Sequence, residues 1–199
     1  MKVKDIFFSV QAESSWAGLP CIIIQLQEGN EPYTDMTVEE ISDKVTRMNC
    51  GIVEFDHGSF TNLDNVVSII KKINEVHPER IFHYLLKTPQ TVDVCDFLAR
   101  MDEEQLFQSS KLNYYIILKI CSWDDLNPDN FTALCDQDEV GFLCYNLQDY
   151  EKIREIITQN NLGNTFVSVS GAHDLVFNAI ITDGLRTRFQ PTVTYPRHR

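Results

Sequence analysis

The sequence predicts an α/β fold in which mostly parallel strands alternate with helices. Six short apolar segments, rich in Ile, Val, Phe and Tyr, are separated by segments with helical periodicity. The apolar segments are continuous rather than alternating, which is typical of strands covered on both faces. A strand followed by a helix, repeated about six times, gives parallel strands with right-handed crossovers. A closed eight-unit barrel needs about 250 residues and this chain has 199, so we expect an incomplete (β/α)6 barrel, with a flat doubly wound sheet as the alternative.

The predicted strands follow one another along nearly the whole chain, so we expect a single domain over residues 1–199. In either sheet arrangement, ligands bind at the carboxyl ends of the parallel strands. The strands are predicted at 21–26, 51–55, 80–86, 113–119, 140–145 and 165–169.

Helix signals lie between the strands. The first helix begins at a capping box, in which the Thr37 oxygen and the Glu40 carboxylate satisfy free amides at the helix start. Thr61 is expected to cap the second helix. The last helix, near 172–182, is expected to stop at Gly184, because glycine readily takes the left-handed conformation that ends helices. Further helices are predicted from about Thr91, over 147–160, and over a short segment near 131–135.

Composition excludes several classes of protein. The net charge of −12 argues against broad contact with a nucleic acid backbone, which requires clustered Lys and Arg. No apolar segment approaches the roughly 18 residues of a membrane span, and residues 1–10 lack the apolar core of a secretory signal. We therefore expect a cytoplasmic protein with no nucleic acid or membrane partner. The basic C-terminus, with Arg186, Arg188 and 197–199, is either a solvated end or a contact for an anion or acidic partner.

The six cysteines do not form a metal-binding motif. No two lie within four residues of each other, so neither zinc nor iron–sulfur spacing is present. Several lie in apolar segments, and we interpret them as small core residues with reduced thiols. A metal site assembled from distant cysteines is the alternative. The cysteines are Cys21, Cys50, Cys95, Cys121, Cys135 and Cys144.

Three short motifs near the two ends of the chain point to a family. Residues 11–20 have the form Q-x-E-x-x-W-x-G-x-P, with Ala12 and Ser14 at the second and fourth positions. Residues 37–41 read T-V-E-E-I, and residues 183–190 have the form D-G-L-x-x-R-x-Q. These motifs resemble Q-G-E-G-x-x-x-G-x-P, T-x-E-E-I and D-G-L-x-x-R-x-Q of the 7-carboxy-7-deazaguanine synthases, which are radical S-adenosylmethionine (SAM) enzymes. The resemblance implies a partial barrel of radical SAM type and a homodimer.

The departures from the family pattern fall on its chemistry. In that family the loop after the first strand carries a C-x-x-x-C-x-x-C-type triplet that holds a four-iron cluster, whereas residues 27–35 here contain no cysteine. Of the family's G-G-E-P turn, which supports the methionine part of the cofactor, only Gly58 matches. Reductive cleavage of S-adenosylmethionine needs an electron from a low-potential cluster held by thiolates. The resemblance therefore implies a scaffold without cluster, cofactor or radical activity.

Five residues are candidate ligand contacts. By resemblance, Gln11 and Glu13 lie where the family contacts its pterin substrate; the alternative is a structural turn bonded to backbone amides. His57 follows Asp56 at a predicted strand end, where an aspartate can orient an imidazole, but neighbouring strand residues point to opposite faces, which favours a polar loop residue. Lys119 ends another strand and either binds an anion or is solvated. Gly58, retained from the cofactor turn, completes the set.

Taken together, these patterns favour a non-catalytic homologue that acts as a binding or assembly module. No cofactor or metal is expected, and the partners expected are a second copy of the chain, another protein such as a true synthase, or a small heterocyclic ligand. The alternative is an enzyme repurposed for non-radical chemistry on a purine- or pterin-like molecule. That alternative requires Glu13, His57 and Lys119 to converge around one cavity.

Overall fold

A mostly parallel sheet runs through the described chain. The structure, a computed structural model, describes residues 1–199 except 13, 27–31, 57–58, 61, 109–111, 124–125, 171–173 and 191–199, and describes only the backbone of 170, 174–175 and 187–190. The strands are β1 (Lys2–Val10), β2 (Pro20–Leu26), β3 (Thr34–Asp35), β4 (Ile52–Phe55), β5 (Phe82–Leu86), β6 (Leu112–Ile120), β7 (Glu139–Cys144), β8 (Thr165–Ser170) and β9 (Arg186–Gln190). Their order is β3-β1-β2-β4-β5-β6-β7-β8-β9.

The strand directions confirm the predicted α/β class with mostly parallel strands. Neighbours from β2 through β9 pair in parallel, whereas β1 pairs antiparallel with β2 and with β3. All six predicted strands are present, within a few residues of the expected bounds. Three strands were missed: β1, β3 and β9. They lie at or near the sheet edges, where less apolar surface is buried and the continuous apolar pattern is absent.

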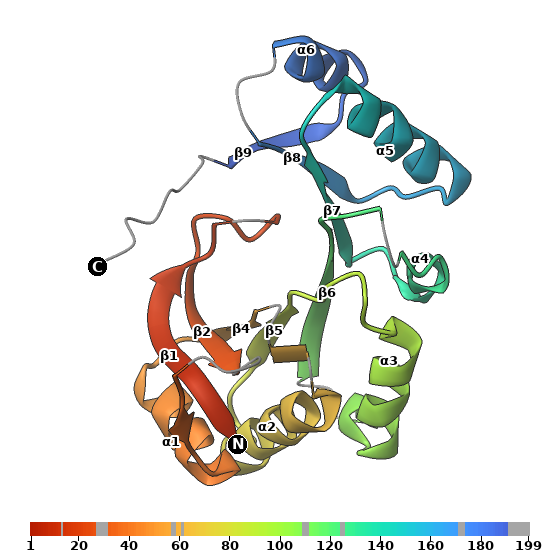
Figure 1. Ribbon diagram of the computed structural model, residues 1–199. Coiled ribbons are helices and arrows are strands. Elements are labelled where there is room, and N and C mark those ends of the chain that lie inside the picture. Colours follow the sequence, from red (N-terminus) through yellow and green to blue (C-terminus); the bar gives the residue numbers. More distant parts are fainter. Residues whose placement is uncertain are drawn as a thin grey trace.

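The helices occupy the predicted connections (Figure 1). The capping box is confirmed, because the Glu40 amide donates to Thr37 Oγ1 at 3.2 Å and the Thr37 amide donates to Glu40 Oε2 at 2.7 Å. The second helix is capped by Asn62 rather than Thr61, which lies outside the described residues. Gly184 follows the last helix with φ of 68°, as predicted. The helices are α1 (Val38–Arg47), α2 (Leu63–Val76), α3 (Val94–Glu103), α4 (Asp129–Ala133), α5 (Leu147–Gln159) and α6 (Asp174–Thr182), with a 3-10 turn η2 (Leu106–Gln108).

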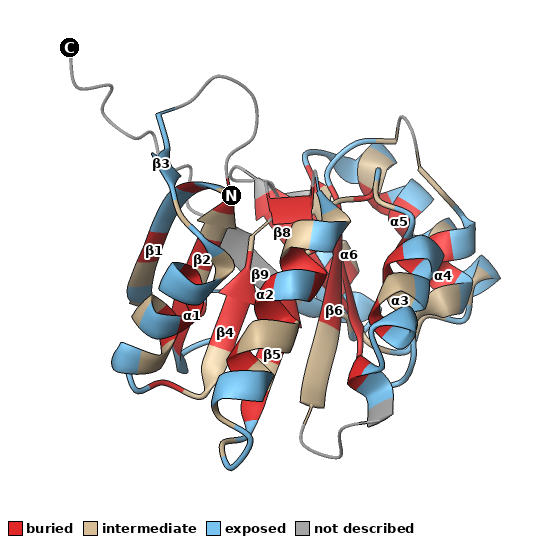
Figure 2. Cartoon of the chain, turned by 90° about the horizontal axis from the view of Figure 1, so that it is seen from below, coloured by how far each residue is buried: buried red, intermediate tan, exposed pale blue. Residues whose placement is uncertain are grey.

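None of the described helices is both long and apolar enough to cross a membrane. Their apolar faces pack instead against one face of the sheet, which we call the outer face. Val53 and Phe55 of β4 and Val66 and Ile70 of α2 belong to the large core formed there, and all four are fully buried. Figure 2 shows this band of buried strand residues between the helices. Burial of side chains of this size contributes about 1.5–3 kcal/mol each, so the outer face is the main source of stability.

The opposite, inner face of the sheet is more polar. Glu54 alternates with the core residues Val53 and Phe55 along β4 and is nevertheless buried. Lys119 of β6 and Glu139 of β7 are also buried, on strands whose neighbouring residues belong to the outer core. A strand places successive side chains on opposite faces, so these charged residues face away from the helices. The inner face is therefore where polar chemistry is concentrated.

Substitution of Gly141 tests how tightly the inner face is packed. Gly141 pairs with Phe166 of β8, and a Cβ added at Gly141 would lie 2.3 Å from Phe166 Cζ. Gly141→Ala is expected to lower the free energy of unfolding by about 1–3 kcal/mol, because the ring must shift in a packed site. Urea denaturation measures this loss. Gly163→Ala, where nothing lies within 4 Å of the added Cβ, is the matched control, and an equal effect of both substitutions would contradict the packing argument.

Candidate functional site

The connection between β1 and β2, residues 11–19, reaches across the inner face toward β7 (Figure 1). We call it the inner loop. Its middle is fixed by Trp16, whose ring centroid lies 5.3 Å from that of His83 on β5 and 4.7 Å from that of Tyr115 on β6. Tyr115 Oη lies 3.4 Å from His83 Nδ1. Such aromatic contacts contribute about 0.5–1.5 kcal/mol per pair beyond the area they bury, so Trp16 anchors the loop.

Backbone geometry explains how the inner loop turns back on itself. The Gln11 amide donates to the Leu19 carbonyl, and the Gly18 amide donates to the Gln11 carbonyl, both at 2.8 Å. Gly18 has φ of 91°, a value that glycine adopts without strain. Ser14 has φ of 66°, which a residue with a Cβ rarely adopts, and its Oγ accepts a hydrogen bond from the Trp16 amide at 3.2 Å. The local hydrogen bond offsets part of the strain at Ser14.

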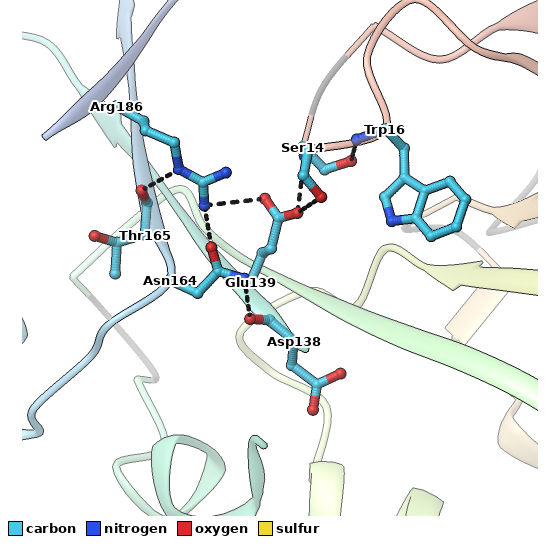
Figure 3. A network of polar contacts seen from close by, with 8 residues as sticks. Ser14, Trp16, Asp138, Glu139, Asn164, Thr165 and Arg186 are labelled. Atoms are coloured by element: carbon cyan, nitrogen blue, oxygen red, sulfur yellow. Dashed lines mark hydrogen bonds and ion pairs between the residues drawn. The ribbon is translucent and has the colours of Figure 1, made fainter. Parts of the chain in front are cut away.

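The inner loop is joined to the last strands through Glu139 (Figure 3). The Ser15 amide donates to Glu139 Oε1 at 2.8 Å, and the Ser15 hydroxyl donates to the same oxygen. Arg186 Nη2 of β9 lies 3.6 Å from Glu139 Oε2. Arg186 is itself positioned by Nε, which donates to the Thr165 carbonyl at 3.3 Å, and by Nη2, which donates to Asn164 Oδ1. A buried carboxylate requires such compensation, so Glu139 holds the two ends of the chain together.

A second buried carboxylate lies on β4. Glu54 is 2% exposed, and its Oε1 accepts from Lys87 Nζ at 3.0 Å. Glu54 Oε2 accepts a hydrogen bond from Gln11 Nε2, so the start of the inner loop is bonded to the centre of the sheet. Lys87 follows β5, and Gln11 is also buried. The three side chains form a network in which a buried charge is both paired and hydrogen-bonded.

Two further groups, the Asp56 carboxyl and the Cys21 thiol, have raised pKa values. Burial raises the pKa of the Asp56 carboxyl, and the hydrogen bonds that it accepts from Gln25 and Ser59 only partly oppose this effect. Ser59 Oγ donates to Asp56 Oδ1 at 3.2 Å. Burial, together with the nearby charge of Glu54, raises the pKa of the Cys21 thiol to about 11. Cys21 therefore stays protonated at neutral pH, which makes it a poor nucleophile and a poor metal ligand.

Lys119 lies on β6 and is 4% exposed, so the expectation that it is a solvated strand end is wrong. Its Nζ lies 5.1 Å from the centroid of the Phe166 ring. Gly141, the β7 neighbour of both residues, leaves space for this ring. A cation held over an aromatic face in a dry site gains up to about 2 kcal/mol, which helps explain how the amine is accommodated. Anion binding by Lys119 stays a prediction.

The structure tests only part of the predicted site. Gln11 is described, and its side chain donates to Glu54. Glu13, His57 and Gly58 lie outside the described residues, so their convergence with Lys119 stays untested. Sequence reasoning missed the carboxylates of β4 and β7 and the partner Lys87, and it identified Arg186 only as part of the basic C-terminus. For Glu54 a signal existed, since a charge inside the apolar segment I-V-E-F is expensive to bury without a partner.

The prediction that the cysteines are core residues was right for three of the six. The described residues contain no group of three or more His, Cys, Asp or Glu side chains placed to hold a metal ion. The thiols are free rather than paired in disulfides. Cys21, Cys50 and Cys144 are buried as expected, whereas Cys95, Cys121 and Cys135 are exposed.

Comparison with known proteins finds one partial relative. The 7-carboxy-7-deazaguanine synthase of Chlorobaculum tepidum is 28% identical over 90 residues, which correspond to 39% of this chain and 41% of the relative. The match thus spans about two fifths of the relative's length. No family model matches the chain, and no solved structure matches it. The relative bears the name of the family that the motifs resemble, and the similarity covers only part of each chain.

The raised pKa of Asp56 predicts a pH-dependent effect of Asp56→Asn. A carboxyl whose pKa is higher in the folded state stabilises the fold below its ordinary value of 3.8, and this contribution is lost as the pH rises through the folded value. The asparagine side chain of the variant does not ionise, so the variant does not lose stability in this way. The free energy of unfolding of Asp56→Asn minus that of the natural protein should therefore increase from acidic to neutral pH. Urea denaturation across this range measures it. Asp43→Asn, at an exposed position of α1, is the control, and a pH-independent difference at Asp56 would contradict the assignment.

Breaking the buried pair on β4 should be costly. Glu54→Gln leaves Lys87 without its carboxylate partner, and we expect a loss of about 3–5 kcal/mol in the free energy of unfolding. The double variant Glu54→Gln with Lys87→Met should recover part of this loss, because the unpaired amine is removed, while the favourable charge of Lys87 near Asp56 is lost with it. Glu104→Gln, which breaks the exposed pair with Lys71, serves as the control and should cost less than about 1 kcal/mol. Equal losses for both single variants would show that Glu54 is not effectively buried.

Proposed function

We propose that this chain is a non-catalytic homologue of the 7-carboxy-7-deazaguanine synthases that acts as a binding or assembly module. The proposal includes an incomplete (β/α)6 barrel of radical SAM type, which is supported by parallel strands, helices packed on the outer face and the partial relative. One observation carries it: the inner face, where a barrel of this kind works on its ligands, is occupied by the chain's own inner loop.

The inner loop is attached to the sheet at three separate places. Gln11 bonds to β4, Ser15 bonds to β7, and Trp16 packs against β5 and β6. The two buried carboxylates on the same face already form ion pairs within the chain. Glu54 pairs with Lys87, and Glu139 pairs with Arg186. A ligand of the inner face must displace these contacts, which supports a structural use of the face over a catalytic one.

The thiols of the chain also do not fit a four-iron cluster. Such a cluster needs thiolates that converge on one point. The loop after β2 encodes no cysteine over residues 27–35. Of the described thiols nearest to this strand, Cys21 is buried with a pKa of about 11, and Cys50 Sγ donates to the Pro20 carbonyl at 3.3 Å. The donor set therefore supports loss of the cluster, and no step of radical chemistry is assigned to this chain.

The alternative function is non-radical chemistry on a purine- or pterin-like molecule. It is favoured by the buried amide and carboxylate of Gln11 and Glu54, which match the paired donors and acceptors of such heterocycles. Asp56, with its raised pKa, has the character of a proton-transfer group. This function requires the inner loop to move away from the sheet, and it also draws on Glu13 and His57, which lie outside the described residues.

The decisive experiment compares this chain with the Chlorobaculum tepidum synthase after anaerobic iron–sulfur reconstitution. We expect a colourless protein that forms no 5′-deoxyadenosine from S-adenosylmethionine, while the synthase turns brown and forms it. A brown protein that forms 5′-deoxyadenosine would overturn the proposal. Incubation with purines and pterins, followed by mass spectrometry, tests the alternative: turnover that Asp56→Asn abolishes would favour the repurposed enzyme over the binding module.

A further inference from the structure

A groove lies between β1 and α1, on the outer side of the sheet. It has a cavity volume of about 660 Å³ and is lined by the start of β1, by β3 and by one face of α1. That helix face carries Glu40, Asp43, Lys44 and Arg47, which are spaced so that they lie side by side. We call this site the edge groove. Its volume falls in the range of ligand clefts, roughly 300–1,000 Å³.

The edge groove continues into an open strand edge. β3 pairs with β1 only at Lys2 and Val3. From Asp5 to Val10, this side of β1 has no strand partner in the part of the chain that the structure describes. We call this segment the β1 edge. An open edge presents backbone amides and carbonyls that can pair with another strand.

The backbone groups of alternate residues point outward from the β1 edge. The Gln11 amide donates to the Leu19 carbonyl on the β2 side. In an antiparallel pair this bonding alternates, so the groups of Ser9 also face β2, whereas those of Phe8 and Val10 face outward. An added strand therefore bonds to Phe8 and Val10. Its residues opposite them point to the outer face of the sheet, on the side of the edge groove.

The far end of the β1 edge is apolar and uncovered. Phe8 is 57% exposed and Val10 is 55% exposed, whereas Ile6 on the same face of the strand is buried in the outer core. The length of α1 explains the difference. The helix begins just after Met36, whose backbone bonds to Met1, and its ten residues extend over about 15 Å. The nine residues of β1 extend over about 30 Å, so α1 covers only the first half of the strand.

Four charged side chains of the edge groove have no partner among the described residues. Asp35, Asp43, Lys44 and Arg47 form neither a hydrogen bond nor an ion pair there through their side chains. α1 leads from β3, at the start of β1, to β4, which begins near the end of β1. Along the groove the order is therefore acidic at Asp35 and Asp43, then basic at Lys44 and Arg47. A strand antiparallel to β1 meets the basic end first.

We propose that the β1 edge and the edge groove together bind an extended peptide segment of another protein, which adds to the sheet as a strand antiparallel to β1. The inference deepens the proposed binding function and rests on it. At alternate positions the segment carries two apolar residues opposite Val10 and Phe8, then an acidic residue for the Arg47 end of the groove and a basic residue for the Asp35 end.

The order of charges distinguishes this partner from others. A uniformly basic segment is attracted by the net charge of −12, but it leaves Lys44 and Arg47 without a carboxylate. The β1 strand of a second copy does not fit either, because in it Lys2 and Lys4 precede the apolar residues. The groove therefore favours a segment in which apolar residues come first, an acidic residue next and a basic residue last.

Fluorescence anisotropy with the full chain and a labelled peptide V-T-V-T-E-T-K tests the proposal. The two valines of the peptide are placed for Val10 and Phe8, and we expect saturable binding with a Kd below about 1 mM. The peptide V-T-V-T-K-T-E has the same composition with the charges exchanged, and it should bind at least about tenfold more weakly. N-methylation of the third residue, whose amide faces β1, should weaken binding by a similar factor, whereas N-methylation of the fourth should not.

Substitutions in the protein test the two parts of the site separately. Val10→Glu and Arg47→Glu should each weaken binding of V-T-V-T-E-T-K by at least about tenfold, because each places a like charge beside the peptide. Arg47→Glu should also bind V-T-V-T-K-T-E more tightly than the natural protein does. Ile81→Glu is the matched control for Val10→Glu, since Ile81 is also 55% exposed but lies outside β1, and it should leave binding unchanged.

Two further readouts keep the test independent of misfolding. Circular dichroism of the variants should be unchanged because the substituted side chains are exposed. Hydrogen exchange at the Phe8 and Val10 amides should slow when the peptide is added to the natural protein.

Several results would overturn the inference. These are a lack of saturation up to about 1 mM peptide, equal binding of the two charge orders, and equal effects of N-methylation at the third and fourth residues. If a second copy of the chain occupies the β1 edge, peptide binding weakens as the protein concentration rises, which also overturns it. None of these results bears on radical activity, which the reconstitution experiment tests separately.

Discussion

The structure depends on how two carboxylates are buried on the inner face of the sheet. Glu54 and Glu139 lie on separate parallel strands, and each is almost completely removed from water. An isolated buried carboxylate would cost several kcal/mol, so each needs a cation and hydrogen-bond donors close by. Lys87 and Arg186 supply the cations, and the inner loop supplies the donors through Gln11 and Ser15. The position of the inner loop follows from this electrostatic requirement.

The inner loop also solves a packing problem. A parallel sheet needs cover on both faces, and the helices cover only the outer one. Trp16 fills part of the inner face, with tilted and edge-to-face ring contacts to His83 of β5 and Tyr115 of β6. The resemblance to the synthase motif places Ser14 where that family has a glycine, and Ser14 here adopts φ of 66°. Ser14 is strained in this conformation, and the bond from the Trp16 amide to Ser14 Oγ stabilises the turn.

Local sequence patterns predicted most of the helices and strands, but they could not predict contacts between residues far apart in the chain. The apolar segments, the capping box at Thr37 and the terminator Gly184 are read within a few neighbouring residues, and the structure contains all of them. β1 was missed because its burial is uneven and one of its edges is open. The hydrogen bond between Ser15 and Glu139 joins positions 124 residues apart, and no sequence motif predicts this contact. Gln11 was identified as a site residue for its motif, but its bond to Glu54 of β4, 43 residues along the chain, emerges only from the way the inner loop folds over the sheet.

None of the inner-loop contacts described above involves residues 32–35, the part of the segment after β2 that the structure describes. Opening the inner face would remove Gln11 from Glu54 and Ser15 from Glu139, leaving two buried carboxylates with fewer donors. The absence of cysteine from residues 27–35 and the contacts that hold the inner loop over the inner face are therefore two separate features of this chain. Each supports the proposed non-catalytic function on its own.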